Sequence, residues 1–139
     1  MLICGVAIRP GKPVSFGRIG RTLVIALPGN PAAAYVTFLA LGLPLLRHLS
    51  GETSSPEPWR RIRAGFAHRK TPGLREYLRA RLTRQSDGTL QAVSCRDNGP
   101  AMLASLAEAD GLIMLAEDET GFDAGREILF ADFQSLEAV

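Results

Sequence analysis

A charge-free run of apolar residues, VIALPGNPAAAYVTFLA, covers residues 24–40 and is broken at its middle by Pro28, Gly29, Asn30 and Pro31. The break predicts a strand that ends at the first proline and a helix that begins at the second. Asn is a strong N-cap, and Pro suits the first helical position because its fixed φ is already helical. A helix N-terminus that follows a buried strand is a place where α/β sheets bind anions. We therefore expect this turn to be shaped for an anion, although geometry alone would equally fit a turn that only ends a strand and starts a helix.

The length and composition are those of a globular chain. A chain of 139 residues buries roughly two-thirds of its surface on folding, and contents of 46% hydrophobic and 22% charged residues exclude disordered and fibrous classes. The turn interrupts the uncharged residues 22–46, which leaves a run shorter than the roughly 20 residues that a bilayer requires. Cys4 and Cys95 lie far apart, without a CxxC pair or a preceding signal peptide. We expect a cytoplasmic protein with reduced thiols and no membrane partner.

Charge is segregated along the chain, although the formal net charge is only +2. No Asp or Glu precedes Glu52. Residues 60–84 hold eight arginines and one lysine against the single Glu76, whereas residues 103–139 are predominantly acidic. Such blocks often mark only solvated faces. An all-basic first third nevertheless favours an anionic ligand over a cation.

The first part of the chain has the pattern of an α/β fragment. Three short apolar runs predict strands, at residues 3–8, 14–19 and 22–27. They lack strict alternation, which is typical of strands covered on both faces. A helix is predicted over residues 31–49, apolar nearly all round and therefore buried on several sides or packed against a partner. Pro44 should kink or disturb its last turns.

A change in composition divides the chain. Residues 50–59, SGETSSPEPW, are rich in Gly, Ser and Pro and predict a linker. Beyond it, partly alternating runs predict strands at residues 60–66, 75–84, 88–95, 111–117 and 126–133, with a helical turn at residues 102–109 and a hairpin turn at residues 86–88. The predicted fold is an α/β fragment, residues 1–53, followed by a small all-β barrel-like domain, residues 54–139.

A second rigid turn supports the anion hypothesis. The loop RPGKP places Arg9 and Lys12 three residues apart around a Pro-Gly turn, so that both cations can converge on one site. Two exposed basic residues are more often only solvated surface. A cationic turn and a helix N-terminus that lie within some twenty residues, on neighbouring strands, favour a binding site instead.

These motifs resemble a known family. GVAIRPGKPVSFG (residues 5–17) and ALPGNPAAAYVTF (residues 26–38) are similar to the end of the molybdopterin molybdenumtransferases, which include MoeA and the E domain of gephyrin. KTPGLREYLRARL (residues 70–82) and LASLAEADGLIMLAED (residues 103–118) resemble the C-terminal β-barrel domain of that family, in the same order. The resemblance implies that the first unit is the closing portion of a MogA-like molybdopterin-binding domain and that the second is domain IV.

The resemblance also implies a function. The family inserts molybdenum from molybdate into adenylylated molybdopterin in a magnesium-dependent step of molybdenum cofactor biosynthesis. By motif, Arg9 and Lys12 would bind oxygens of molybdate or of the molybdopterin phosphate. Pro28, Gly29, Asn30 and Pro31 would line the same site; no catalytic residue is assigned.

The chain departs from the family pattern in three respects. Ala33 stands where a serine is common, and Asn98-Gly99-Pro100 stands where a Gln-Gly-Ser-like turn is usual. The family's magnesium-binding carboxylates lie upstream of the PGKP loop, and Mg²⁺ needs oxygen ligands. We therefore expect no metal site in this chain, a missing N-terminal part as its partner, a homodimer in the complete enzyme, and no activity of the chain alone.

Other candidate residues lack the spacing of a site, and two other function classes fit parts of the sequence. His48 and His68 have no ligand or triad spacing, Ser15 and Ser105 lie in no nucleophile motif, and the acidic cluster lacks the pattern of a calcium loop, at Glu117, Asp118, Glu119 and Asp123. The arginine-rich strands would fit an OB-like barrel that binds nucleic acid, but only Phe66 and Tyr77 could stack on bases. The apolar helix would also fit a non-catalytic assembly or dimerisation module.

Overall fold

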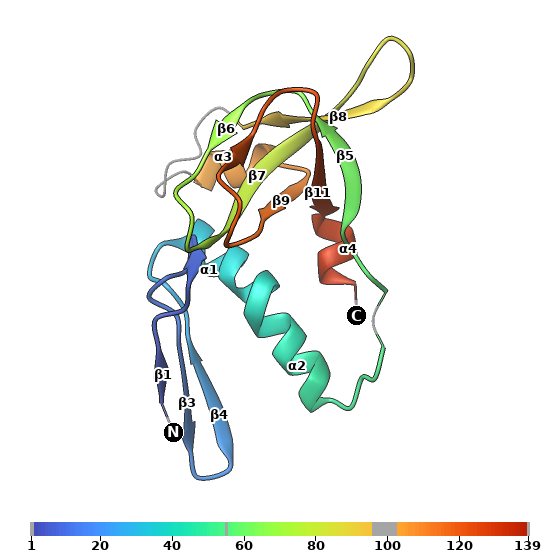
Figure 1. The fold of residues 1–139 in the computed structure, drawn as a ribbon. Coiled ribbons are helices and arrows are strands. Elements are labelled where there is room, and N and C mark those ends of the chain that lie inside the picture. The colour runs from blue at the N-terminus through green and yellow to red at the C-terminus, as the bar shows by residue number, and fades with distance from the viewer. Residues whose placement is uncertain (1, 55, 96–102, 139) are drawn as a thin grey trace.

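The structure of the chain is a computed structural model that describes residues 2–54, 56–95 and 103–138 (Figure 1). Its larger part is a closed barrel. The barrel strands are β5 (Arg60–Ala64), β7 (Arg75–Arg84), β8 (Leu90–Ser94), β9 (Gly111–Leu115) and β11 (Glu127–Asp132). They follow one another in the order β7-β8-β5-β11-β9, and the antiparallel pairing of β9 with β7 closes the circle. The predicted barrel is confirmed.

Alternation along each strand fills the barrel interior. The inward-facing side chains form one buried cluster: Ile62, Ala64, Leu78, Ala80, Ala92, Ile113, Leu115, Ile128 and Phe130. Phe122, from outside the five strands, packs into the same cluster. The predicted hairpin between β7 and β8 is also confirmed, because Gln85 and Thr89 close the turn with an N–H···O bond of 2.8 Å. The predicted helical turn is α3 (Leu103–Glu108). A short pair, β6 (His68–Arg69) with β10 (Gly121–Phe122), lies beside the barrel.

The first part of the chain forms a small antiparallel sheet that projects from the barrel (Figure 1). Its strands are β1 (Ile3–Cys4), β3 (Ser15–Ile19) and β4 (Thr22–Ala26). The expectation that these strands are covered on both faces is wrong for this chain. Ile19 is 75% exposed and Leu23 is 44% exposed, because no described element packs over these positions.

One helical stretch of 19 residues, Pro31–Leu49, follows the sheet. It comprises α1 (Pro31–Thr37), a π turn η1 (Phe38–Gly42) and α2 (Leu43–Leu49). The Leu43 N–H bonds to the Phe38 carbonyl five residues back, so the helix widens just before Pro44, which has no N–H to donate. The predicted disturbance by this proline is confirmed.

Burial of this helix is uneven. Val36 and Leu39 are buried, whereas no residue of α2 is buried. Burial on several sides is therefore confirmed for the first half of the helix, and packing of the second half against a partner stays a prediction. By length and composition the helix could cross a membrane, but a single helix of this kind is weak evidence, since core helices of globular proteins pass the same test.

A short parallel pairing joins the two parts of the chain. The predicted strand over residues 3–8 is in fact broken, because Gly5 has a φ of 73°, and β2 (Ile8–Arg9) continues in a different sheet. Ile8 pairs with Arg75 and Arg9 pairs with Glu76 of β7. A second buried cluster spans the junction: Ile8, Val36, Leu39, Tyr77, Leu112, Ala131 and Leu136.

The C-terminal helix α4 (Phe133–Glu137) adds a second tie across the junction. The ring of Phe133 meets Tyr35 edge-on at 5.6 Å, and the Tyr35 hydroxyl donates to Glu137. Burial, with the hydrogen bond to Glu137, raises the pKa of Tyr35 to about 12. Arg47 also donates to the Leu136 carbonyl at 3.1 Å. Both ends of the chain therefore hold the helix against the barrel.

The barrel core should control stability. Phe130 is fully buried, so Phe130→Ala should lower the free energy of unfolding by about 3–5 kcal/mol through lost burial and the cavity left behind. Leu49 is 54% exposed, and Leu49→Ala should change that free energy by no more than about 0.5 kcal/mol. Urea denaturation monitored by tryptophan fluorescence measures both; equal effects would contradict the assignment of the core.

Candidate oxyanion site

The hairpin of β3 and β4 brings the two predicted turns together. Ser15 pairs with Ala26 in antiparallel register. The RPGKP loop ends two residues before Ser15, and the PGNP turn begins two residues after Ala26. Both turns therefore leave the same end of the hairpin, the end nearest the barrel (Figure 1).

The PGNP turn caps the helix as the sequence predicts. Asn30 has extended backbone angles, with φ −71° and ψ 124°, and its side-chain oxygen accepts the Ala33 N–H at 3.0 Å. Pro31 occupies the first turn and brings no donor. Within the described part of the chain, the N–H groups of Gly29 and Asn30 make no hydrogen bond. These two main-chain donors are therefore available to a ligand at this turn.

The RPGKP loop is held rigidly while its cations remain exposed. Val14 N–H donates to the Gly11 carbonyl at 2.9 Å, and Val6 N–H donates to the Lys12 carbonyl at 3.2 Å. Arg9 and Lys12 are both exposed. Their side chains form no ion pair with any residue in the described ranges. The loop thus presents two positive charges whose backbone positions are fixed.

Gly11 and Gly29, the two glycines of these turns, are subject to different structural constraints. Gly11 has a φ of 116°, and a Cβ there would lie 2.3 Å from the Thr37 hydroxyl oxygen, so the loop packs directly on the helix. Gly29 lies outside the left-handed region, and a Cβ there would meet nothing within 4 Å. Neither conformation nor packing within the described chain requires glycine at position 29. That position leaves open space at the turn.

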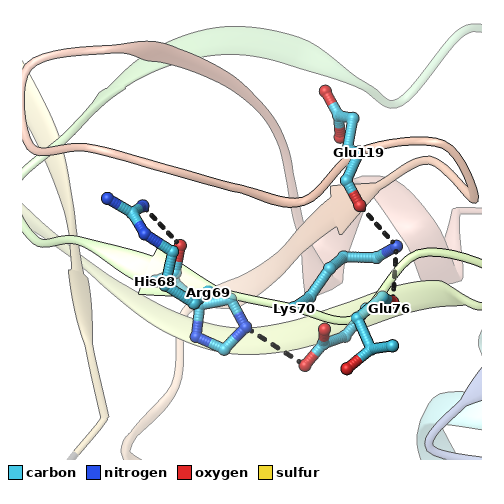
Figure 2. Close-up of polar contacts among 6 residues, drawn as sticks. His68, Arg69, Lys70, Glu76 and Glu119 are labelled. Carbon is cyan, nitrogen blue, oxygen red and sulfur yellow. Dashed lines mark hydrogen bonds and ion pairs between the residues drawn. The ribbon is translucent and has the colours of Figure 1, made fainter.

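The start of β7 lies beside the cationic loop, because the backbone of Arg9 pairs with the backbone of Glu76. Figure 2 shows polar contacts of β7 and of the residues that precede it. His68 Nε2 lies 3.2 Å from a carboxylate oxygen of the buried Glu76. Lys70 Nζ donates to the carbonyls of Glu119 at 2.8 Å and Glu117 at 3.2 Å. These contacts hold two loops together.

Ion pairs also tie the arginine-rich strands to the acidic C-terminal part. Three pairs connect them: Arg60 with Asp132, Arg69 with Asp123, and Arg75 with Glu117. A further pair, Arg126 with Glu119, lies within the acidic part. The hydrogen bond from Arg69 lowers the pKa of the Asp123 carboxyl. Among the described residues, no group of three or more His, Cys, Asp or Glu side chains could hold a metal ion.

The positions that depart from the family pattern differ in what the structure shows. Ala33 is buried in the first helical turn, and its N–H serves the cap. Asn98, Gly99 and Pro100 lie outside the described residues.

Two family models match the chain. The model described as "MoeA C-terminal region (domain IV)" matches residues 61–133, and that described as "Probable molybdopterin binding domain" matches residues 1–48. The chain is 28% identical to a molybdopterin molybdenumtransferase of Haemophilus influenzae over 133 residues, covering 94% of this chain and 33% of the relative. It is 36% identical to molybdopterin molybdenumtransferase 2 of Mycobacterium tuberculosis over 126 residues, covering 88% and 30%. The chain therefore spans about a third of the length of these curated relatives.

Solved structures show the same fold. A molybdopterin biosynthesis moeA protein from Pyrococcus horikoshii OT3 superposes with a TM-score of 0.78 at 20% identity, covering 94% of this chain and 32% of the other. A molybdenum cofactor biosynthesis protein from Pyrococcus furiosus gives a TM-score of 0.76 at 23% identity, covering 94% and 44%.

The contrast between the two glycines is testable. Gly11→Ala should lower the free energy of unfolding by more than about 1 kcal/mol, because the new methyl group meets Thr37 and the φ is unfavourable. Gly29→Ala should leave that free energy unchanged or raise it by about 0.4–1 kcal/mol, since the unfolded chain loses conformational freedom. Thermal or urea unfolding of the two variants measures the difference. A Gly29→Ala chain as unstable as Gly11→Ala would show that packing does require this glycine.

Proposed function

We propose that this chain, which belongs to the MoeA C-terminal region (domain IV) family, supplies the oxyanion-binding turns of a molybdopterin molybdenumtransferase. The complete enzyme would insert molybdenum from molybdate into adenylylated molybdopterin. The observation that carries this proposal is the register of β3 and β4, which places the cationic loop and the helix N-terminus at one end of the hairpin. Both turns come from residues 1–48, which match the molybdopterin-binding model.

Each turn has a distinct role in this proposal. Arg9 and Lys12 offset the negative charge of molybdate or of the molybdopterin phosphate through charge-assisted hydrogen bonds. The N–H groups of Gly29 and Asn30 donate to an oxyanion oxygen, and the dipole of the following helix favours the same charge. Pro28 and Pro31 hold the turn rigid, so the donors are positioned before the ligand arrives. The open space at Gly29 lets the anion approach the main chain.

Magnesium does not fit the residues of this site. Residues 1–51 contain no Asp or Glu, and Mg²⁺ in proteins is bound through one or two carboxylates and phosphate oxygens. We therefore place its protein ligands in another part of the enzyme and derive no step through it here.

The exposed apolar surface of the small sheet also supports the presence of a further part in the complete enzyme. Two grooves, of about 970 and 290 Å³, lie against the small sheet, and the larger is also lined by Leu41 and Leu45 of the helix. A small sheet exposed on both faces is unusual for a protein that acts alone. We propose that residues 1–53 complete an α/β domain whose remainder covers these grooves, and that residues 54–139 are a separate barrel domain. Homodimerisation of the complete enzyme and its cytoplasmic location stay predictions.

The same surface favours a second candidate function, a non-catalytic assembly module. In that case the apolar sheet would bind a partner, and the cations at Arg9 and Lys12 would play no part in chemistry. The two functions differ in what the loss of a single cation does to catalysis.

Removal of the loop lysine in the complete enzyme tests the proposed role. Lys12→Ala should reduce molybdate-dependent cofactor formation by about 10²-fold or more, because a positioned charge at the oxyanion is lost. Arg84→Ala is the matched control, since Arg84 is an exposed arginine of β7 outside both turns. Rates are measured with purified adenylylated molybdopterin. A wild-type rate for Lys12→Ala would remove the catalytic role and leave the assembly module.

A mixing experiment tests whether the chain is one part of a composite site. This chain alone should form no cofactor, whereas addition of a separately produced upstream part of a relative should restore activity. The restored activity should depend on Lys12. If the two parts associate and remain inactive, the proposed contribution of the turns is wrong.

A further inference from the structure

A cavity of about 520 Å³ lies apart from both turns, where α2, the segment that leads to β5 and the outer face of the barrel meet. Its walls include Leu39 and Arg47 from the helix, Trp59 from the connecting segment, Arg75 and Tyr77 from β7, and Met114 from β9. None of the residues assigned to the oxyanion site lines it. Cavities of this size between packed units are typical small-molecule sites.

An aromatic pair forms one wall of the cavity. The rings of Trp59 and Tyr77 lie 6.1 Å apart between centroids, with a tilt of 38°. Tyr77 is 7% exposed and Trp59 is half-buried, so the pair is fixed by packing while the indole remains accessible. Met114 adds a polarisable side chain beside the pair. Such a wall suits a planar ring that stacks offset or edge-on.

Two arginines reach the cavity from opposite elements. Arg75 precedes Tyr77 by two residues on β7, so its side chain lies on the same outer face. Arg75 pairs with Glu117 through Nε at 3.1 Å and through one terminal nitrogen at 3.3 Å, and Glu117 does not line the cavity. The Nε of Arg47 is buried and lies 3.8 Å from a carboxylate oxygen of Glu52. A guanidinium carries five N–H donors, more than one carboxylate can use.

The polar groups of the cavity are not spread evenly. Glu52 and Glu57 lie on the connecting segment, whereas Arg75 lies on the barrel wall beside the aromatic pair. Burial raises the pKa of the Tyr77 hydroxyl, which therefore stays protonated. A ring stacked on the aromatic pair can direct its acid group toward Arg75. If the ring were turned round, the acid group would face the carboxylates of Glu52 and Glu57.

We propose that this cavity is a binding site for a small planar aromatic ring that carries an acid group, with the ring against Trp59 and Tyr77 and the acid toward Arg75. Carboxylates and phosphates share the chemistry that Arg75 recognises, because a guanidinium pairs with either through two parallel hydrogen bonds. This site is independent of the molybdate chemistry proposed above.

Trp59 is the only tryptophan of the chain, so its fluorescence reports on this site directly. The full chain is titrated with phenyl phosphate and with benzoate, which distinguish a phosphate site from a carboxylate site. Phenol tests the ring alone, and inorganic phosphate tests the acid alone. We expect a saturable change with at least one of the two aromatic acids, and binding of phenol and inorganic phosphate about tenfold weaker or more, since each lacks half of the contacts.

Two arginine variants on one strand complete the test. Arg75→Gln should weaken binding by about tenfold or more, through loss of a charged hydrogen-bond donor. Arg81→Gln is the matched control, because Arg81 is an exposed residue of β7 that does not line the cavity, and it should leave binding unchanged. Thermal unfolding verifies that both variants fold. If Arg75→Gln does not fold, Arg75→Lys replaces it, because lysine keeps the charge but loses the paired donors.

Three results would overturn the proposal. One is the absence of any saturable change up to about 10 mM of either aromatic acid, an affinity too weak for a built site. Another is equal binding of phenol, which would show that the acid group is not recognised. The third is equal weakening by the variants of Arg75 and Arg81, which would show only a general effect of charge.

Discussion

The parallel pairing of Ile8 and Arg9 with Arg75 and Glu76 is the contact on which the arrangement of this chain depends. It fixes the start of the cationic loop against a barrel strand. The buried cluster beneath it then takes Val36 from the helix and Leu112 from the barrel. Because the loop lies between this pairing on one side and the hairpin register on the other, its position is determined twice. A loop held in this way can present two cations that form no ion pair within the described residues, without collapsing onto nearby carboxylates.

Local signals in the sequence predicted the elements more fully than their pairing. Asn30 and Pro31 predicted the start of the helix because capping depends only on neighbouring residues. The alternation of β7 and the turn before Thr89 predicted a hairpin for the same reason. Pairing of β2 with β7 joins residues more than sixty positions apart, and two-residue strands carry no period to detect. The five-residue helix α4 is likewise too short for a helical pattern.

The candidate site divides along the same line. The sequence alone predicts the chemistry of Arg9, Lys12 and the PGNP turn, because it depends on residue type. The hairpin of β3 and β4 is enough to bring the two turns to one end of the sheet. The sequence does not predict the contact of His68 with Glu76, because it joins β6 to β7 and neither residue lies in a recognisable motif spacing. The burial expected for the strands of the small sheet was also wrong. Apolar composition shows only that a segment is able to pack, and no element of the described chain covers Ile19 and Leu23.

The rigidity of the two turns and the covering of the small sheet therefore depend on different contacts. The turns are held by the barrel pairing, by the contact of Gly11 with Thr37 and by the Asn30 cap, all of which lie within the chain. The apolar faces of β3 and β4 are open, and they belong to the strands whose ends carry those turns. A partner that covered the faces would reach the turns at the edge of the same sheet. Any groups that it supplied would then meet cations that are already in place, which lowers the entropic cost of assembling a composite site.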